Sequence, residues 1–176
     1  MPMKRLTAMM AVVALALTAC SSKEEAKKHN EADVTFVQAM IPHHEQALHM
    51  SELAAEHANS PDTKTIASTI KTKQEEEIKT METLLHEWGV KKETGHGAHG
   101  EGMLSEQELK ELEEARGVEF DKLFLNEMIK HHKGAITMAE EAEHEGENKE
   151  VKKLAAEIKR GQEHEIEEME KELVGL

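Results

Sequence analysis

The chain contains one stretch of sequence twice, and this duplication limits the folds that it can adopt. Residues 33–88 align without gaps onto residues 121–176, at an offset of 88, and 21 of the 56 aligned positions are identical. A repeat should be interpreted before any single motif, because each copy is expected to form the same structural unit. The sequence therefore predicts two copies of one unit, joined by a linker over residues 89–118.

Each copy has the residue spacing of two helices. In the first copy one stripe steps alternately by four and three positions, which places its members on one helix face: Phe36, Met40, His43, Ala47, Met50, Ala54 and His57. The polar cluster at residues 59–62 then predicts a turn, and a second stripe runs from Ala67 to Trp88. Two helical hairpins can bury their apolar faces only against each other. The predicted fold is therefore all-α, a four-helix bundle made of two tandem hairpins.

Two local features modify this picture. Ser105 followed by Glu108 has the form of a capping box, which predicts a short helix in the linker that ends near Arg116. Pro42 lies inside the first predicted helix, where it removes a backbone hydrogen-bond donor. We expect a kink or a restart of the helix at this position.

The first 19 residues have the pattern of a bacterial lipoprotein signal peptide. Lys4 and Arg5 precede an apolar run that is too short to cross a bilayer as a mature helix. The run ends in Leu17-Thr18-Ala19-Cys20, the form of a lipobox, and Cys20 is the only cysteine. We expect export, removal of residues 1–19 and acylation of Cys20 by chains such as palmitate. Residues 20–30 would be a tether, and residues 31–176 the four-helix domain, held to the outer face of the cell membrane or to the outer membrane.

The chain is strongly acidic, with a formal net charge of −14. Removal of the leader would make it more negative, because Lys4 and Arg5 are lost and no acidic residue is. Such a surface argues against nucleic acid as a partner and raises the local concentration of cations. The simpler interpretation is that the charge keeps a helical protein soluble.

Polar residues occupy stripe positions where an ordinary bundle would have leucine. They recur in both copies: His43, Gln74 and Glu77, then His131, Gln162 and Glu165. With the turn centred near residue 60, hairpin geometry places His43 opposite Glu77 and Met40 opposite Met81. The second copy gives the corresponding pairs, His131 with Glu165 and Met128 with Met169. His44 and His132 lie about 100° further round their helices, on the flank.

Two interpretations of this polar layer remain open. An unpartnered buried polar group costs about 1–3 kcal/mol, so histidine and glutamate could form a buried hydrogen bond that fixes the register, while methionine fills gaps. Alternatively the layer binds a metal. Imidazole and thioether together suit Cu(I) first, with Cu(II) or zinc behind it, and the glutamates would be ligands or would orient the rings. Its recurrence in both copies favours the metal, which His96, His99 and Met103 of the linker could capture.

The segments around the paired histidines, residues 40–50 and 120–139, resemble the signature of the domain-of-unknown-function 305 (DUF305) family, as does the closing segment from Gln162 to Met169. The resemblance covers about residues 33–176. It implies an exported, ferritin-like four-helix bundle, linked in some members to copper binding and tolerance. The ligands that it implies are Met40, His43, His44 and Met50, with Met128, His131, His132 and Met138. The first copy departs from the common pattern, with Gln46 where the second has Gly134.

We therefore predict an extracytoplasmic, membrane-anchored protein that binds copper and buffers it or hands it on without turnover chemistry. The alternatives are a ferritin-like di-metal oxidase that uses iron, and an interaction bundle without metal. Methionine thioethers beside the site are unfavourable for an iron centre that carries out oxidation, which weighs against the oxidase. Because a ligating histidine must be neutral, copper affinity is expected to fall below about pH 6.5.

Overall fold

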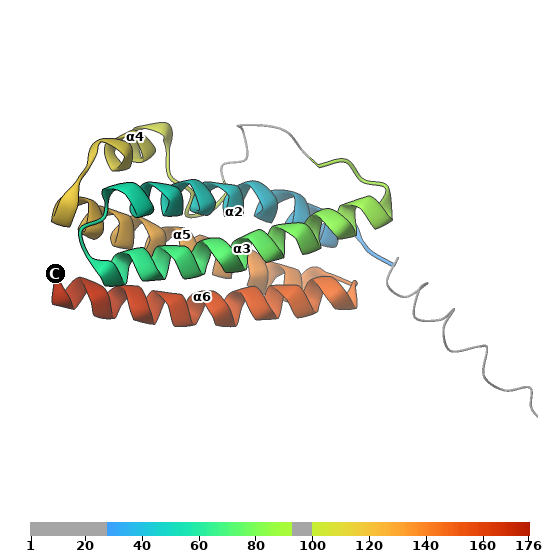
Figure 1. The fold of residues 1–176 in the computed structure, drawn as a ribbon. Coiled ribbons are helices and arrows are strands. Elements are labelled where there is room, and N and C mark those ends of the chain that lie inside the picture. Colours follow the sequence, from blue (N-terminus) through green and yellow to red (C-terminus); the bar gives the residue numbers. More distant parts are fainter. Residues whose placement is uncertain (1–27, 93–99) are drawn as a thin grey trace, which may run out of the picture.

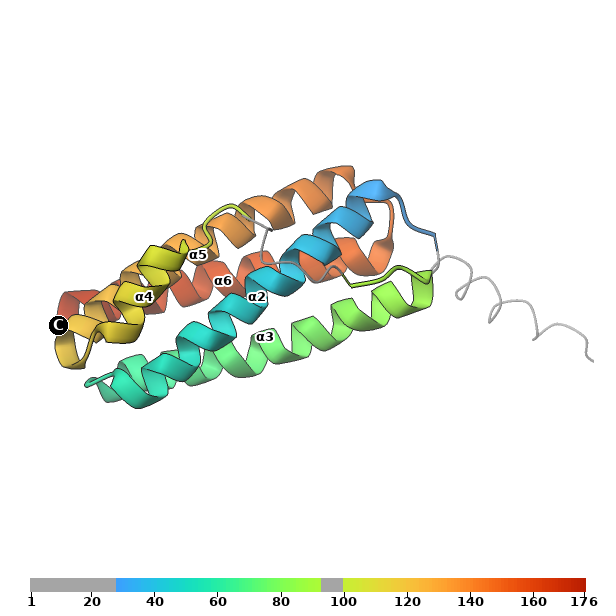
Figure 2. The same cartoon turned by 90° about the horizontal axis from the view of Figure 1, so that it is seen from above.

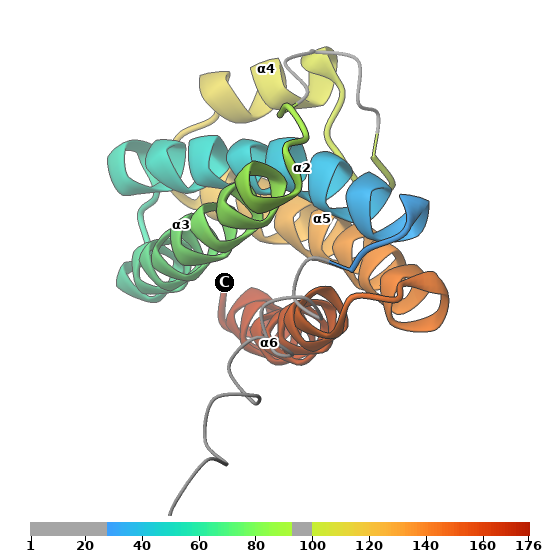
Figure 3. The ribbon, with the colours of Figure 1, turned by 90° about the vertical axis from the view of Figure 1, so that its right-hand side faces the viewer.

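The computed structural model describes residues 28–92 and 100–176, and within them it contains helices and no strand. The elements are α2 (Glu31–His57), α3 (Pro61–Trp88), α4 (Glu106–Glu114), α5 (Gly117–Glu145) and α6 (Lys149–Gly175). The four long helices form a bundle, and the short α4 lies outside it, against α2 and α5 (Figures 1 and 3). The prediction of an all-α bundle is confirmed.

The helix ends follow local sequence chemistry. The hydroxyl of Ser60 caps α3 by accepting from the backbone N–H groups of Asp62 and Thr63, and Ser105 forms the predicted capping box at the start of α4. The helix α2 continues through Pro42, so the restart that we considered there does not occur. Within the described ranges, no helix is long and apolar enough to span a membrane.

Two equivalent aspartates join the hairpins to each other. The buried carboxylate of Asp33, near the start of α2, accepts from the backbone N–H groups of Glu147 and Asn148 at the other hairpin's turn, at 3.1 and 3.0 Å. Asp121, its counterpart on α5, accepts from the backbone of Asn59 and Ser60 at 3.0 Å each. These bonds place the beginning of α2 beside the end of α5, so the two helices are antiparallel (Figure 2).

The core is divided along the bundle axis into two apolar clusters. One contains Phe36, Met40, Met81, Leu84 and Ile158 among others, and the second contains Met50, Ile70, Phe120, Phe124, Met128 and Met169 among others. Between them each helix contributes two polar residues, which together we call the polar layer: His43, His44, Gln74, Glu77, His131, His132, Gln162 and Glu165. The single layer is shared by both hairpins, whereas the sequence analysis assigned one layer to each.

Candidate metal centre

Four histidines form the middle of the polar layer. His43 and His44 on α2, and His131 and His132 on α5, each have 0% exposure. The rings of His43 and His131 face each other between the two helices, with 3.8 Å between their centroids. His44 and His132 lie on the flank of their helices, where the sequence places them, and this flank is buried because α3 and α6 cover it.

The carboxylates of the layer pair with the second histidine of each motif. His44 Nε2 lies 2.7 Å from Glu77 Oε2, and His132 Nε2 lies 2.9 Å from Glu165 Oε2. The predicted pairs, in which His43 faces Glu77 and His131 faces Glu165, are therefore wrong by one residue. Hairpin arithmetic gives the correct turn of the helix, but the first histidine points toward the other hairpin, whose position a single hairpin does not determine.

The hydrogen bonds fix which ring nitrogen carries the proton. A carboxylate and a carbonyl oxygen only accept, so the Nε2–H groups of His44 and His132 donate to their glutamates, and that of His43 donates to the carbonyl oxygen of Glu101 at 3.1 Å. A neutral ring then keeps a lone pair on Nδ1. In all three rings this Nδ1 is buried and without a partner in the described structure, and His131 has neither nitrogen paired.

Burial keeps three of these imidazoles, those of His43, His131 and His132, neutral. Desolvation, reinforced by the neighbouring His44, lowers the pKa of His43 from 6.5 to about 3. Desolvation also places the pKa of His131 well below its usual value, and it lowers that of His132 although His132 donates a hydrogen bond to Glu165. Burial opposes ionisation of Glu165, but hydrogen bonds from His132 and Lys73 outweigh it and lower the pKa of that carboxyl. His43, His131 and His132 are thus neutral nitrogen donors, and the Glu165 carboxylate supports one of them.

The chain after the first hairpin covers the side of the layer where α2 meets α5. The side-chain amide of Gln46 holds Leu104 twice, donating to its carbonyl oxygen at 3.0 Å and accepting from its N–H at 2.8 Å. On α5, Gly134 leaves room for the same segment, because a Cβ there would lie 1.8 Å from the carbonyl oxygen of Glu101. The difference between Gln46 and Gly134, which the sequence showed only as a departure from a pattern, therefore has a structural reason.

Sulfur lies on both sides of the histidines. Met40 and Met81 are fully buried in one apolar cluster, against which Met138 packs, and Met50, Met128 and Met169 are fully buried in the other. Met103 approaches from the covering segment: a Cβ on Gly100 would lie 3.5 Å from its Sδ and 3.3 Å from Cδ2 of His43. His96, His99 and Cys20 lie outside the described residues.

Oxygen and nitrogen ligands alone do not complete a site for a divalent ion. Residues 28–92 and 100–176 contain no group of three or more His, Cys, Asp or Glu that could hold a metal ion. An ion in the polar layer would instead be bound by few imidazole nitrogens, with thioethers from the flanking clusters. That donor set fits a soft monovalent ion better than zinc or a di-iron centre, which need more nitrogen or oxygen donors.

Three features of the site escaped the sequence analysis. Glu101 accepts the hydrogen bond of His43 with its backbone carbonyl oxygen, so the identity of its side chain gives no sign of this role. The roles of Asp33 and Asp121 were also missed, although their identity in both copies was a usable signal. Gln74 and Gln162 were recognised as polar seam residues, but not as amides that remain buried and unpartnered in the described structure.

Solved structures with a similar fold include metal-bound forms of CopM. A DUF305 fragment from Deinococcus radiodurans is 32% identical, covers 84% of this chain and 98% of its own, and gives a TM-score of 0.78. CopM in its Cu(I)-bound form is 33% identical, with 79% and 93% coverage and a TM-score of 0.70, and Cu(II)-bound and Ag-bound forms of CopM also match. A Streptomyces coelicolor protein described as secreted is 26% identical, with 78% and 89% coverage and a TM-score of 0.72.

No functionally curated protein is detectably similar in sequence. The family model described as domain of unknown function (DUF305) matches residues 33–173, so the protein belongs to the DUF305 family.

Proposed function

We propose that this protein binds copper outside the cytoplasm, as Cu(I) first, and buffers it or hands it on without turnover chemistry. The observation that carries the proposal is a set of buried imidazole nitrogens that have no partner among the residues that the structure describes. Five such nitrogens, one each on His43, His44 and His132 and two on His131, lie in one layer. Each costs stability if it stays unpaired, and a bound ion would satisfy it.

The protonation and orientation of the histidine rings support metal binding. A histidine ligand must offer a lone pair, and the neutral rings of His43, His131 and His132 do so without first losing a proton. The Glu77 and Glu165 carboxylates hold the ring orientation of His44 and His132 in the way that carboxylates commonly support metal-bound histidine. Thioethers on both sides of the layer then favour Cu(I) over harder ions.

The comparisons support copper as the ion. CopM, of similar fold and 33% identity, has solved structures in Cu(I)-bound, Cu(II)-bound and Ag-bound forms. We carry the ion over to this chain because the histidines that the DUF305 resemblance implies as ligands are the ones that meet in the polar layer. His96 and His99 would assist by capturing the ion, and Met103, beside His43, would hand it inward.

We further propose that the protein is exported and held to a membrane by a lipid on Cys20. The lipobox at residues 17–20 and the short apolar run before it support this, as does the secreted relative. Metabolic labelling with a palmitate analogue tests it: label should be incorporated by the wild type and not by Cys20→Ala. Equal labelling of both proteins would contradict the lipid anchor.

A Cu(I) competition titration tests the metal proposal. The wild type should take Cu(I) from a colorimetric chelator, and His43→Leu with His131→Leu should lose this binding. His86→Ala with His164→Ala removes two exposed histidines and is the matched control, which should bind as the wild type does. If the wild type binds no Cu(I) and the leucine variant is simply more stable, the layer only specifies packing, and the proposal is wrong.

A further inference from the structure

A groove lies between α3 and α6, on the side of the bundle away from the covering segment. Its volume is about 520 Å³, and Glu77 and Glu165 are both part of its lining. These carboxylates are also the hydrogen-bond partners of His44 and His132, which have 0% exposure. The groove therefore reaches the polar layer from outside, because Glu77 and Glu165 line it and also contact the imidazoles.

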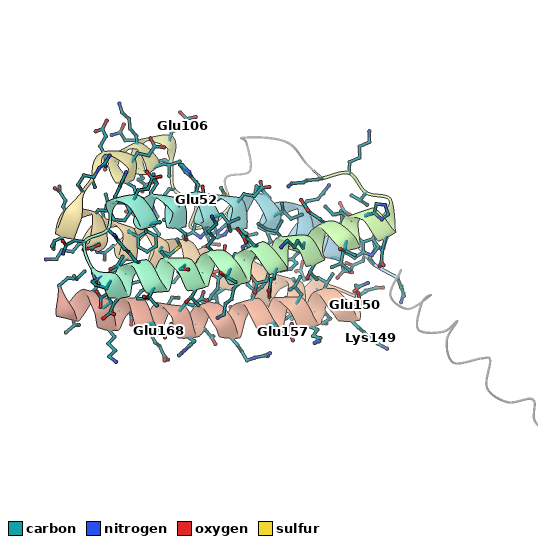
Figure 4. All side chains as sticks on the ribbon, in the orientation of Figure 1. Glu52, Glu106, Lys149, Glu150, Glu157 and Glu168 are labelled. Atoms are coloured by element: carbon teal, nitrogen blue, oxygen red, sulfur yellow. The ribbon has the colours of Figure 1, made fainter. Side chains whose placement is uncertain are left out.

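The lining of the groove suits a passing cation. Besides Glu77 and Glu165 it contains Glu76, Glu150 and Glu157, the last two labelled on α6 in Figure 4. Gln74 and Gln162 also line it, with exposures of 1% and 3%, and neither end of either amide has a partner in the part of the chain that the structure describes. The carboxylates raise the local concentration of any cation in the groove, including Cu(I).

The lining also contains two lysines. Lys153 is 76% exposed and lies 3.7 Å from Glu157, whereas Lys73 is paired with Glu165. Lys73 Nζ is 2.8 Å from Glu165 Oε1, and it is 3.7 Å from where a Cβ on Gly161 would lie. Lys73 and Gly161 are equivalent positions in the two copies, 88 residues apart. A glycine inside a helix costs about 1 kcal/mol relative to alanine, so its presence opposite the lysine calls for a reason. Room for the lysine side chain, and for an ion that displaces it, supplies that reason.

The opposite side of the layer offers less access. There the Glu101 carbonyl accepts from His43, and Gln46 fixes Leu104 through two hydrogen bonds. Opening that side would break these contacts, whereas opening the groove requires only that the half-exposed Lys73 leaves Glu165.

We propose that the groove between α3 and α6 is the route by which Cu(I) enters and leaves the polar layer, and that Lys73 holds this route closed by occupying Glu165. The proposal rests on the proposed function, because it concerns the ion that the histidines bind. In this scheme an incoming ion meets the groove acids, displaces the Lys73 ammonium from Glu165, and passes the Gln74 and Gln162 amides to the imidazoles.

Stopped-flow transfer of Cu(I) from a colorimetric chelator to the metal-free protein tests the route. Gly161→Leu places a side chain in the groove, and it favours the helix, so the fold is retained. It should slow loading and release alike by about tenfold or more and leave the equilibrium affinity unchanged, because a narrowed path affects both directions equally. Gly175→Leu, on the same helix and with open space around it, should load at the wild-type rate.

Lys73→Met should accelerate loading by about threefold or more, because it removes a positive charge from the path of a cation. Lys79→Met, an exposed lysine of α3, is its control. If Gly161→Leu loads as fast as the wild type, or changes affinity without changing rates, the groove is not the route. If the wild type itself takes up no Cu(I), the proposed function fails and this inference fails with it, an outcome distinct from the previous one.

Discussion

The buried histidines should make the metal-free protein sensitive to mild acid. In the unfolded chain His43 has its usual pKa of 6.5, and in the folded protein its pKa is about 3. Between these two values the unfolded state binds more protons, so stability must fall as the pH falls below 6.5. From pH 7.5 to pH 5.5, His43 alone accounts for a loss of about 1.4 kcal/mol in the free energy of unfolding.

His131 and His132 act in the same direction, because burial lowers the pKa of both. The chosen range stays above the usual pKa of carboxyl groups, so Glu165, whose lowered pKa stabilises the fold down to more acidic pH, contributes little to the change. The total loss should therefore exceed the His43 contribution.

Urea unfolding of the metal-free protein at the two pH values, followed by circular dichroism, measures this loss. His43→Leu with His131→Leu should be more stable at pH 7.5 and should lose most of the pH dependence. Equal stability of the wild type at the two pH values, or an unchanged pH dependence in the variant, would refute the burial of neutral imidazoles.

Four further outcomes follow from the geometry. Cu(I) affinity should be nearly constant between pH 7.5 and pH 5.5, because His43 and His131 are already neutral in this range. This differs from the fall in affinity below pH 6.5 that the sequence alone predicts. Competition titrations at both pH values measure the affinity. Asp121→Asn should cost about 1–3 kcal/mol in urea unfolding, since it weakens two charge-assisted bonds between the hairpins. Gly134→Ala should destabilise the fold by about 1–3 kcal/mol in the same assay, because its Cβ would overlap the Glu101 carbonyl. Glu165→Gln should cost about 1–3 kcal/mol by removing the charge that His132 and Lys73 bind, again measured by unfolding.

Exposed positions provide the controls for these variants. Glu56→Gln changes a carboxylate that is 79% exposed, and Gly175→Ala adds a methyl group in open space. Both should unfold as the wild type does. An Asp121→Asn or Glu165→Gln variant as stable as Glu56→Gln would contradict the assigned hydrogen bonds, and a neutral Gly134→Ala would contradict the close approach of the covering segment. A Cu(I) affinity that drops tenfold or more at pH 5.5 would contradict neutral ligands.

The secondary structure could be predicted because its signals are local. Stripe spacing, the turn at residues 59–62 and the Ser105 capping box all depend on neighbours a few positions away, and each was recovered. The duplication added the number of hairpins and the recurrence of the polar residues. Whether the helix continues through Pro42 or restarts there could not be decided from the sequence, because the surrounding bundle, which holds the helix together, is absent from a local view.

The site was predicted in composition and less well in geometry. The arithmetic of one hairpin locates the layer along the helices. Two consecutive histidines, however, differ by about 100° around the helix. Only the packing of the second hairpin determines that His44 contacts Glu77 while His43 contacts His131, its counterpart in the second copy. The same limit applies to Gln46 and Gly134, whose partners lie in the linker. Contacts between copies follow from packing, which the repeat itself does not encode.

Nitrogen-15 NMR of the histidine rings tests the central claim most directly, because Cu(I) is diamagnetic and each ring nitrogen reports its own bonding. On addition of Cu(I), the nitrogen chemical shifts of His43 and His131 should change, and those of His44 and His132 should change with them. The chemical shifts of the exposed His86 and His164 should remain the same. Shifts confined to His86, His164 or other exposed rings, with the four buried histidines unchanged, would contradict a copper site in the polar layer.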